Sequence, residues 1–336
     1  MAAAACGGSD STTTTETSAG ASSAPAAAQV KVGLAYDIGG RGDGSFNDAA
    51  GRGLDQAVSE LKVEKKELEA TAGETDAQKE ERLRLLAQGG YNPVIAVGFA
   101  YSGSVAKVAP EYPEVKFAIV DDADAKGDNI TNLLFAEEQG SFLVGVAAAL
   151  KSEKGSVGFI GGVETPLIKK FEAGFTAGAK AVKSDIKIQA KYLTQPPDFG
   201  GFNDPAKGKT VAQGMYDAGA DVVYHAAGGS GSGVFEAAKA AGAMAIGVDS
   251  DQAALPAYAN FKDVIITSML KKVDVAVFDF LKNYTTGTVK SGASVYDLKA
   301  GGVDYSTTGG KIDDIKSKID EYKQKIVNGE ITVPTS

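Results

Sequence analysis

Short apolar runs alternate with helical stretches along the chain from Val30 onward. A strand–helix repeat of this kind predicts an α/β fold in which helices cover both faces of parallel sheets. We expect strands over 30–36, 65–69, 94–98, 116–121, 131–135, 156–160, 186–191, 221–226, 243–248, 263–267 and 294–298. We expect helices over 48–61, 76–89, 102–109, 137–151, 167–182, 205–218, 232–241 and 269–284. So many strands exceed one ordinary domain, and the length fits two doubly wound lobes.

Charge and hydropathy argue against two classes of partner. The net charge of −9 and the isoelectric point near 4.9 disfavour a nucleic-acid-binding surface. The longest apolar stretch, 141–150, is much shorter than the ~20 residues that a membrane-spanning helix needs. We interpret it as a buried helix.

The single cysteine, Cys6, is surrounded by small residues. This pattern is similar to the end of a bacterial lipoprotein signal, where the cysteine is acylated and becomes the mature N-terminus. The charged and apolar regions of a signal do not precede it, so we interpret residues 1–5 as the remnant of a removed signal. A chance cysteine in a disordered tail is the alternative. Residues 7–29 contain too few large apolar side chains to order themselves. We therefore expect residues 1–29 to be a signal remnant followed by a disordered tether.

A glycine-rich loop, DIGGRGDGSFND over residues 37–48, directly follows the first expected strand. Its glycines let the backbone approach a bound group closely. Phe46 is the one large apolar side chain near the end of this loop. The residues alone leave two interpretations open, contact with a ligand and packing in the core beneath the loop.

Other expected strands also end in polar or small residues, where ligands of doubly wound sheets bind. The candidates are Asp37, 98–102, Asp121, Asp122, Gly161, Gly162, 225–230, 249–252, Ser268 and Lys271. Carboxylates, glycines and aromatic rings together favour a polar, uncharged small molecule with hydroxyl and N–H groups. One lysine among several carboxylates disfavours a phosphate.

Catalytic and metal-binding interpretations find little support in the sequence. His225 is the only histidine and Cys6 the only cysteine, so no Cys/His pair or zinc site is expected. No convincing nucleophile elbow or P-loop is present, and residues 121–128 lack the closing glutamate of a calcium loop. Residues 41–43 form an Arg-Gly-Asp tripeptide, which we attribute to chance. We expect no catalytic residue, no metal and no cofactor.

A set of short motifs, in order along residues 30 to about 325, resembles the basic membrane protein (BMP) family. The motifs are 37–47 with its Ser-Phe-Asn end, 117–121, 135–145, 158–162, 171–178, 224–234, 247–252 and 267–274. The family consists of lipid-anchored substrate-binding proteins of ABC importers, many of which bind purine nucleosides. The resemblance implies a type I periplasmic-binding-protein fold, with two Rossmann-like lobes, three crossovers and a ligand cleft between the lobes. Mapped onto this chain, one lobe comprises 30–133 plus 256–290 and the other 134–255 plus 291–330.

The resemblance also implies roles for individual residues. Phe46 would stack on one face of a purine, and Phe171, Phe199 or Phe202 would close the other face. Asn47 and Asp121 would contact the base edge, whereas Asp249 and Lys271 would hold the ribose hydroxyls. Gly228 would lie in close backbone contact with the ligand, and Asp37 would accept from the ligand or orient the loop.

The implied partners are a purine nucleoside (inosine, guanosine or adenosine) and an ABC permease. The protein would be a monomer held at the extracytoplasmic face of a bacterial cell membrane by a lipid on Cys6. Two alternatives remain open, a sugar- or autoinducer-type binding protein of the same fold and a nucleoside-cleaving enzyme.

Overall fold

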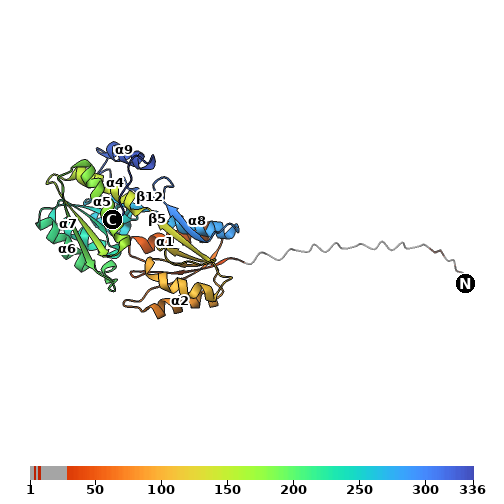
Figure 1. The fold of residues 1–336 in the computed structure, drawn as a ribbon. Coiled ribbons are helices and arrows are strands. Elements are labelled where there is room, and N and C mark those ends of the chain that lie inside the picture. Colours follow the sequence, from red (N-terminus) through yellow and green to blue (C-terminus); the bar gives the residue numbers. More distant parts are fainter. Residues whose placement is uncertain (1–3, 5–6, 9–28) are drawn as a thin grey trace.

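The structure is a computed structural model that describes residues 4, 7–8 and 29–336, and its two α/β lobes lie next to each other (Figure 1). The first sheet has the order β2-β1-β3-β4-β5-β11, and all its strands are parallel. Its strands are β1 (Lys31–Ala35), β2 (Glu64–Leu68), β3 (Val94–Ala96), β4 (Phe117–Val120), β5 (Ile130–Phe135) and β11 (Gly292–Tyr296).

The second sheet has the order β7-β6-β8-β9-β10-β12, and only β12 runs antiparallel to its neighbour. Its strands are β6 (Ser156–Val163), β7 (Lys187–Thr194), β8 (Val222–Ala226), β9 (Met244–Asp249), β10 (Ile265–Lys271) and β12 (Val303–Tyr305). The chain order reverses between β1 and β3 in the first sheet and between β6 and β8 in the second. Such switch points are where doubly wound sheets bind ligands.

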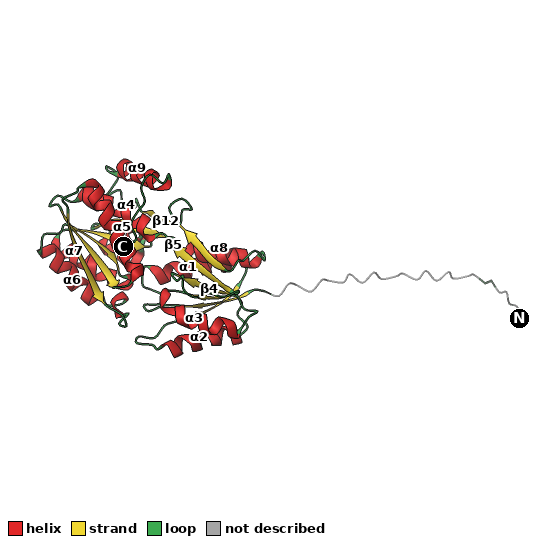
Figure 2. Ribbon diagram, viewed as in Figure 1, coloured by secondary structure: helices red, strands yellow, loops and turns green. Residues whose placement is uncertain are grey.

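Helices flank the strands of both sheets (Figure 2). The first lobe contains α1 (Phe46–Leu61), α2 (Asp76–Gln88), α3 (Ser102–Val108) and α8 (Val273–Thr285). The second contains α4 (Glu137–Lys151), α5 (Pro166–Val182), α6 (Pro205–Asp217), α7 (Gly231–Ala241) and α9 (Lys316–Val327). Helix α1 packs against α8, α2 against α3, α4 against α5, and α6 against α7. Short 3₁₀ turns occur at Phe99–Tyr101, Ala109–Glu111, Gly200–Phe202, Gly228–Ser230, Gln252–Ala254 and Pro256–Phe261.

Glycines allow α4 and α5 to touch along their backbones. A Cβ at Gly178 would lie 2.0 Å from the Phe142 carbonyl oxygen, and one at Gly174 would lie 2.1 Å from that of Glu138. Both contacts are much closer than a methyl group tolerates. This close packing fixes the position of α5, which carries Phe171 to the space between the lobes.

The predicted fold class is confirmed, because two sheets that are parallel except for β12, with helices on both faces, form the two lobes. The chain passes between them three times, after β5, after β10 and after β11. Two elements near the C-terminus, the short strand β12 and the 12-residue helix α9, were not predicted.

The predicted lobe boundaries differ from the structure near the C-terminal crossovers. The range 256–290 was assigned to the first lobe, but β10 pairs with β9 in the second sheet. The range 291–330 was assigned to the second lobe, but β11 pairs with β5 in the first. The predicted helix 269–284 was also wrong at its start, because the strand continues to Lys271 and α8 begins at Val273. Pairing with β9 and β12 keeps residues 269–271 extended.

The expectations for the N-terminal segment fall almost entirely on residues outside the described part of the chain, including Cys6. Within the described part, no helix has the length and apolar character required to cross a membrane.

Candidate functional site

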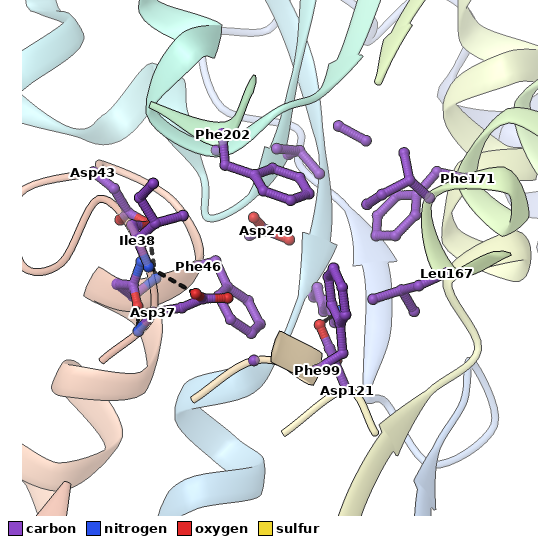
Figure 3. A pocket seen from close by; sticks show the side chains of 17 residues that line it. Asp37, Ile38, Asp43, Phe46, Phe99, Asp121, Leu167, Phe171, Phe202 and Asp249 are labelled. Atoms are coloured by element: carbon purple, nitrogen blue, oxygen red, sulfur yellow. Dashed lines mark hydrogen bonds and ion pairs between the residues drawn. The ribbon is translucent and has the colours of Figure 1, made fainter. Parts of the chain in front are cut away.

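A pocket lies between the two lobes, at the carboxyl ends of their strands (Figure 3). Such a position is typical of small-molecule sites in doubly wound folds. The first lobe supplies residues that follow β1, β3 and β4. The second supplies residues that follow β6 and β7, residues at or just after the ends of β8 and β9, and the end of β10. The lining residues are Asp37, Ile38, Asp43, Phe46, Asn47, Gly98, Phe99, Asp121, Leu167, Ile168, Phe171, Phe202, Ala226, Gly228, Val248, Asp249 and Lys271.

The Asp43 carboxylate organises the loop between β1 and α1. It accepts hydrogen bonds from the backbone N–H groups of Ser45 (2.9 Å), Asn47 (2.9 Å) and Asp48 (3.1 Å). These groups lie at the N-terminus of α1, where unpaired N–H donors and the helix dipole favour a negative charge. The Asn47 side chain donates to Asp43 (3.1 Å) and accepts from the Asp37 N–H (3.1 Å). The loop therefore holds Phe46, the first residue of α1, in a fixed position.

Aromatic side chains from both lobes point into the same space (Figure 3). Phe46 comes from the first lobe, whereas Phe171 lies on α5 and Phe202 lies in the turn after β7. Phe99 also lines the pocket and meets the Phe202 ring edge-on, with 6.4 Å between ring centroids. Phe199 does not line this pocket; it packs against Phe99 at 5.8 Å, beside a neighbouring hollow.

A buried ion cluster forms one wall of the pocket. The Lys271 ammonium lies 2.5 Å from an Asp121 oxygen and 3.1 Å from a Glu137 oxygen. It also lies 5.2 Å from the ring centroid of Phe46 and 5.5 Å from that of Phe171, within the range of cation–π attraction. The Lys271 ammonium therefore contacts both the buried carboxylates and the aromatic rings of the pocket.

More carboxylates than ammonium groups surround Lys271, and burial and this excess of negative charge together shift the pKa values of Asp121 and Lys271. Burial raises the pKa of Asp121, and the neighbouring Glu137 carboxylate adds to this effect while Lys271 opposes it. Burial likewise raises the pKa of Asp249. The pKa of Lys271 lies above its usual value because attraction to Asp121, Glu137 and Asp249 outweighs the cost of burial. Lys271 is thus an ammonium, and the surrounding carboxylates are suited to accept further hydrogen bonds.

Asp121 and Asp249 both adopt the left-handed backbone conformation, with φ of 67° and 62°. Non-glycine residues rarely adopt this conformation, and those that do concentrate at functional sites. One oxygen of Asp121 is buried and has no hydrogen-bond partner among the described residues. Asp249 accepts a hydrogen bond from the Ser45 hydroxyl at 2.5 Å. The Asp121 oxygen is therefore available to a donor on a bound molecule.

Burial also raises the pKa values of Asp37 and Asp43, each to about 6. One Asp37 oxygen accepts from the Ile38 N–H at 2.8 Å, so this carboxylate helps to shape the loop. Its other oxygen lies beside Gly98, where an added Cβ would approach it to 2.3 Å.

The pocket brings together nine residues for which the sequence predicted a ligand-binding role: Asp37, Phe46, Asn47, Asp121, Phe171, Phe202, Gly228, Asp249 and Lys271. Other candidates at strand ends, Asp122, Gly161, Gly162 and Ser268, do not line it. Sequence reasoning missed Asp43, which was dismissed with the Arg-Gly-Asp tripeptide, and it did not single out Phe99. It also missed Glu137, at the start of α4. Their positions after β1, β3 and β5 were the available signal.

The only histidine does not line the pocket. His225 is fully buried, with its Nε2 atom 3.1 Å from the Gln252 side-chain oxygen. Among the described residues, no group of three or more His, Cys, Asp or Glu side chains has the arrangement of a metal site.

Comparisons with known proteins agree on one family. Residues 29–336 match the family model described as "ABC transporter substrate-binding protein PnrA-like". The chain is 36% identical over 322 residues to the ABC transporter nucleoside-binding protein BmpA of Lactococcus lactis, covering 91% of this chain and 89% of that protein. It is 35% identical over 315 residues to basic membrane protein A of Borreliella burgdorferi, covering 91% and 88%. The crystal structure of an ABC transporter solute-binding protein from Aeropyrum pernix superposes with a TM-score of 0.79 and 30% identity, over 91% of this chain and 94% of that one.

Proposed function

Since the chain belongs to the PnrA-like family of ABC transporter substrate-binding proteins, we propose that it binds a purine nucleoside in the pocket between its lobes. The main support is that aromatic rings from both lobes border the same space as the Asp121 oxygen that is buried and has no hydrogen-bond partner within residues 29–336. The name of the L. lactis relative, a nucleoside-binding protein, supports the same ligand class.

The aromatic side chains are proposed to hold the base. Phe46 stacks on one face of the purine, and Phe171 or Phe202 closes the other. Both partners line the pocket, whereas Phe199 does not, which favours the first two. Stacking of a base on an aromatic ring contributes about 1–3 kcal/mol.

The polar side chains are proposed to read the donors of the nucleoside. Asp121 accepts from an N–H group at the base edge through the oxygen that has no hydrogen-bond partner among the described residues, and the Asn47 amide oxygen, which already accepts from the Asp37 N–H, contacts the same edge. Asp249 and Lys271 hold the ribose hydroxyls. An ammonium has three protons, and among the described residues Lys271 donates a hydrogen bond to Asp121 alone, with Glu137 as a second ion-pair partner.

The backbone near Gly228 is proposed to contact the ligand directly. Gly228 lines the pocket with a positive φ of 53°, which favours a residue without a Cβ. Asp37 orients the loop and presents its second oxygen to the ligand. Because carboxylates predominate around Lys271, a phosphorylated nucleotide meets repulsion that a neutral nucleoside does not.

Titration of ligand-free protein with inosine, guanosine and adenosine is expected to show binding at micromolar or lower concentration for at least one of them. The chain has 12 tyrosines and no tryptophan, so tyrosine fluorescence or calorimetry provides the signal. The matching 5′-monophosphate is expected to bind at least tenfold more weakly. Binding of ribose without any nucleoside would instead support a sugar-binding protein, and release of hypoxanthine from inosine would indicate an enzyme.

We further propose that Cys6 carries the lipid anchor and that a monomer of the protein delivers its ligand to a membrane permease from the extracytoplasmic side. Replacing Cys6 by serine in a precursor with a lipoprotein signal is expected to release the protein from membranes. Two or more acyl chains anchor firmly because each buried CH₂ group contributes about 0.8 kcal/mol. Fractionation with immunodetection measures this, and a Cys6→Ser protein that stays in the membrane pellet would contradict the anchor.

A further inference from the structure

Three consecutive backbone carbonyl groups of the pocket loop, those of residues 43–45, each accept a hydrogen bond from a side chain of the other lobe. The donors all follow β9 in the second lobe. We call these three hydrogen bonds the seam. They join Tyr258 Oη to the Asp43 oxygen (3.1 Å), Gln252 Nε2 to the Gly44 oxygen (2.9 Å) and Ser250 Oγ to the Ser45 oxygen (3.0 Å).

Tyr258 is anchored in the core of its own lobe, and its hydroxyl reaches the other. Its ring is buried and meets the Phe235 ring edge-on, with 5.2 Å between centroids. The loop lies so close to this hydroxyl that a Cβ added to Gly44 would be 2.5 Å from it. Gly44 also has a positive φ of 59°, so both the approach and the backbone conformation require glycine.

Gln252 is held at both ends of its amide. Its oxygen accepts from the Val248 N–H at 2.9 Å, and its nitrogen donates to Gly44. The same oxygen faces His225 Nε2 at 3.1 Å, which means that Nε2 carries the proton. Burial lowers the pKa of His225 to about 4, so the ring is neutral at neutral pH. The only histidine of the chain therefore supports a side chain that reaches across the lobes.

The seam adjoins the residues proposed to bind the ligand. Phe46 directly follows the three carbonyl groups, and Asp249 directly precedes Ser250. The Ser45 hydroxyl donates to Asp249, and Arg52 on α1 donates to the Ser250 hydroxyl at 2.8 Å. We propose that Tyr258, Gln252 and Ser250 are positioning residues that hold the Phe46 loop against the ligand when the lobes are closed. This role rests on the proposed nucleoside site and predicts that the seam controls ligand release.

The physical consequence is a selective effect on the closed state. A hydrogen bond between lobes forms only when they are together, so its loss destabilises the closed form without weakening either lobe. A typical hydrogen bond has a net worth of about 0.5–1.5 kcal/mol, which corresponds to a factor of about 2–13 in an equilibrium constant. Loss of one seam bond should therefore appear mainly as faster ligand dissociation.

Tyr258→Phe and Tyr216→Phe form a matched pair for this test. Each substitution removes one hydroxyl that donates to a backbone carbonyl, and the two residues are 5% and 6% exposed. Tyr216 donates to the Met244 oxygen at 2.9 Å, within the second lobe. In stopped-flow measurements with the nucleoside that binds most tightly, Tyr258→Phe is expected to dissociate about 2- to 13-fold faster, with an unchanged association rate. Tyr216→Phe is expected to lower the melting temperature of the ligand-free protein but to leave dissociation unchanged.

Scattering by the ligand-free proteins provides a second measurement that needs no ligand. The double variant Tyr258→Phe, Ser250→Ala is expected to have a larger radius of gyration than Tyr216→Phe, because fewer molecules are closed. If the wild-type protein binds none of the three nucleosides, the proposed function is refuted. The scattering comparison would still test whether the seam holds the lobes together. Faster dissociation or a larger radius supports the positioning role. The positioning role would be overturned if the seam variants and Tyr216→Phe had equal radii of gyration and their dissociation rates were equal or could not be measured.

Discussion

Replacing Lys271 by methionine is expected to lower the free energy of unfolding by about 3–5 kcal/mol at neutral pH, the cost of breaking a buried ion pair by removing one partner. The lysine is 1% exposed, and its ammonium contacts Asp121 at 2.5 Å and Glu137 at 3.1 Å. Methionine preserves most of the length and apolar packing of the side chain. The decrease in the free energy of unfolding therefore measures the cost of burying two carboxylates without their cation.

The cost is expected to decrease in acid. The pKa of Asp121 is already raised in the folded protein, and removal of Lys271 raises it further. A carboxyl group with a raised folded pKa binds more protons in the folded than in the unfolded state, between the unfolded and folded pKa values. Its contribution to stability therefore increases as the pH falls through that window. The difference between wild type and Lys271→Met should be smaller at pH 5 than at pH 7.5.

Urea unfolding at the two pH values measures this difference. Lys316→Met is a suitable control, because Lys316 pairs with Asp320 on the exposed face of α9 and surface pairs contribute little. It is expected to leave unfolding nearly unchanged. A Lys271→Met protein that is as stable as wild type at both pH values would contradict a charged cluster at the pocket.

Phe46→Ala is expected to weaken nucleoside binding about 5- to 150-fold, as expected for the loss of a base stack worth about 1–3 kcal/mol. Phe46 lines the pocket, but it is only partly buried and also packs against the hydrophobic core. Alanine therefore also lowers stability by leaving a cavity, and the two effects must be separated.

Phe46→Leu separates them, because leucine restores apolar packing but has no aromatic face. We expect this variant to melt close to wild type and still to bind nucleoside more weakly. Calorimetric titration beside thermal melts of the ligand-free protein measures both effects. If Phe46→Leu binds like wild type and only Phe46→Ala melts at a lower temperature, the phenylalanine serves packing alone.

Asp249→Asn is expected to weaken binding of a ribonucleoside more than binding of the corresponding free base, because the proposed partner of Asp249 is the ribose. Asparagine tolerates the left-handed backbone conformation of this position. Calorimetric titration with both ligands measures the difference.

Local sequence patterns were sufficient for most of the framework. Strand and helix periodicity depends on neighbouring residues, so the elements from β1 to α7 lie close to their predicted ranges. The glycine-rich loop after β1 and the carboxylates after β4 and β9 were recognisable because strand ends form one edge of a parallel sheet. The candidate residues could thus be collected from the sequence without knowledge of their contacts.

Contacts between distant segments required the tertiary structure. Residues 269–271 have no local signal that separates strand from helix, and pairing with β9 and β12 decides that they are extended. The geometry of the site depends on similar long-range contacts. The Lys271–Asp121 pair joins residues 150 positions apart, and the hydrogen bond between Ser45 and Asp249 spans 204 positions. Periodicity and local conformational preference report on a few neighbouring residues, whereas ion pairing and lobe closure depend on which distant side chains the folded sheets bring together.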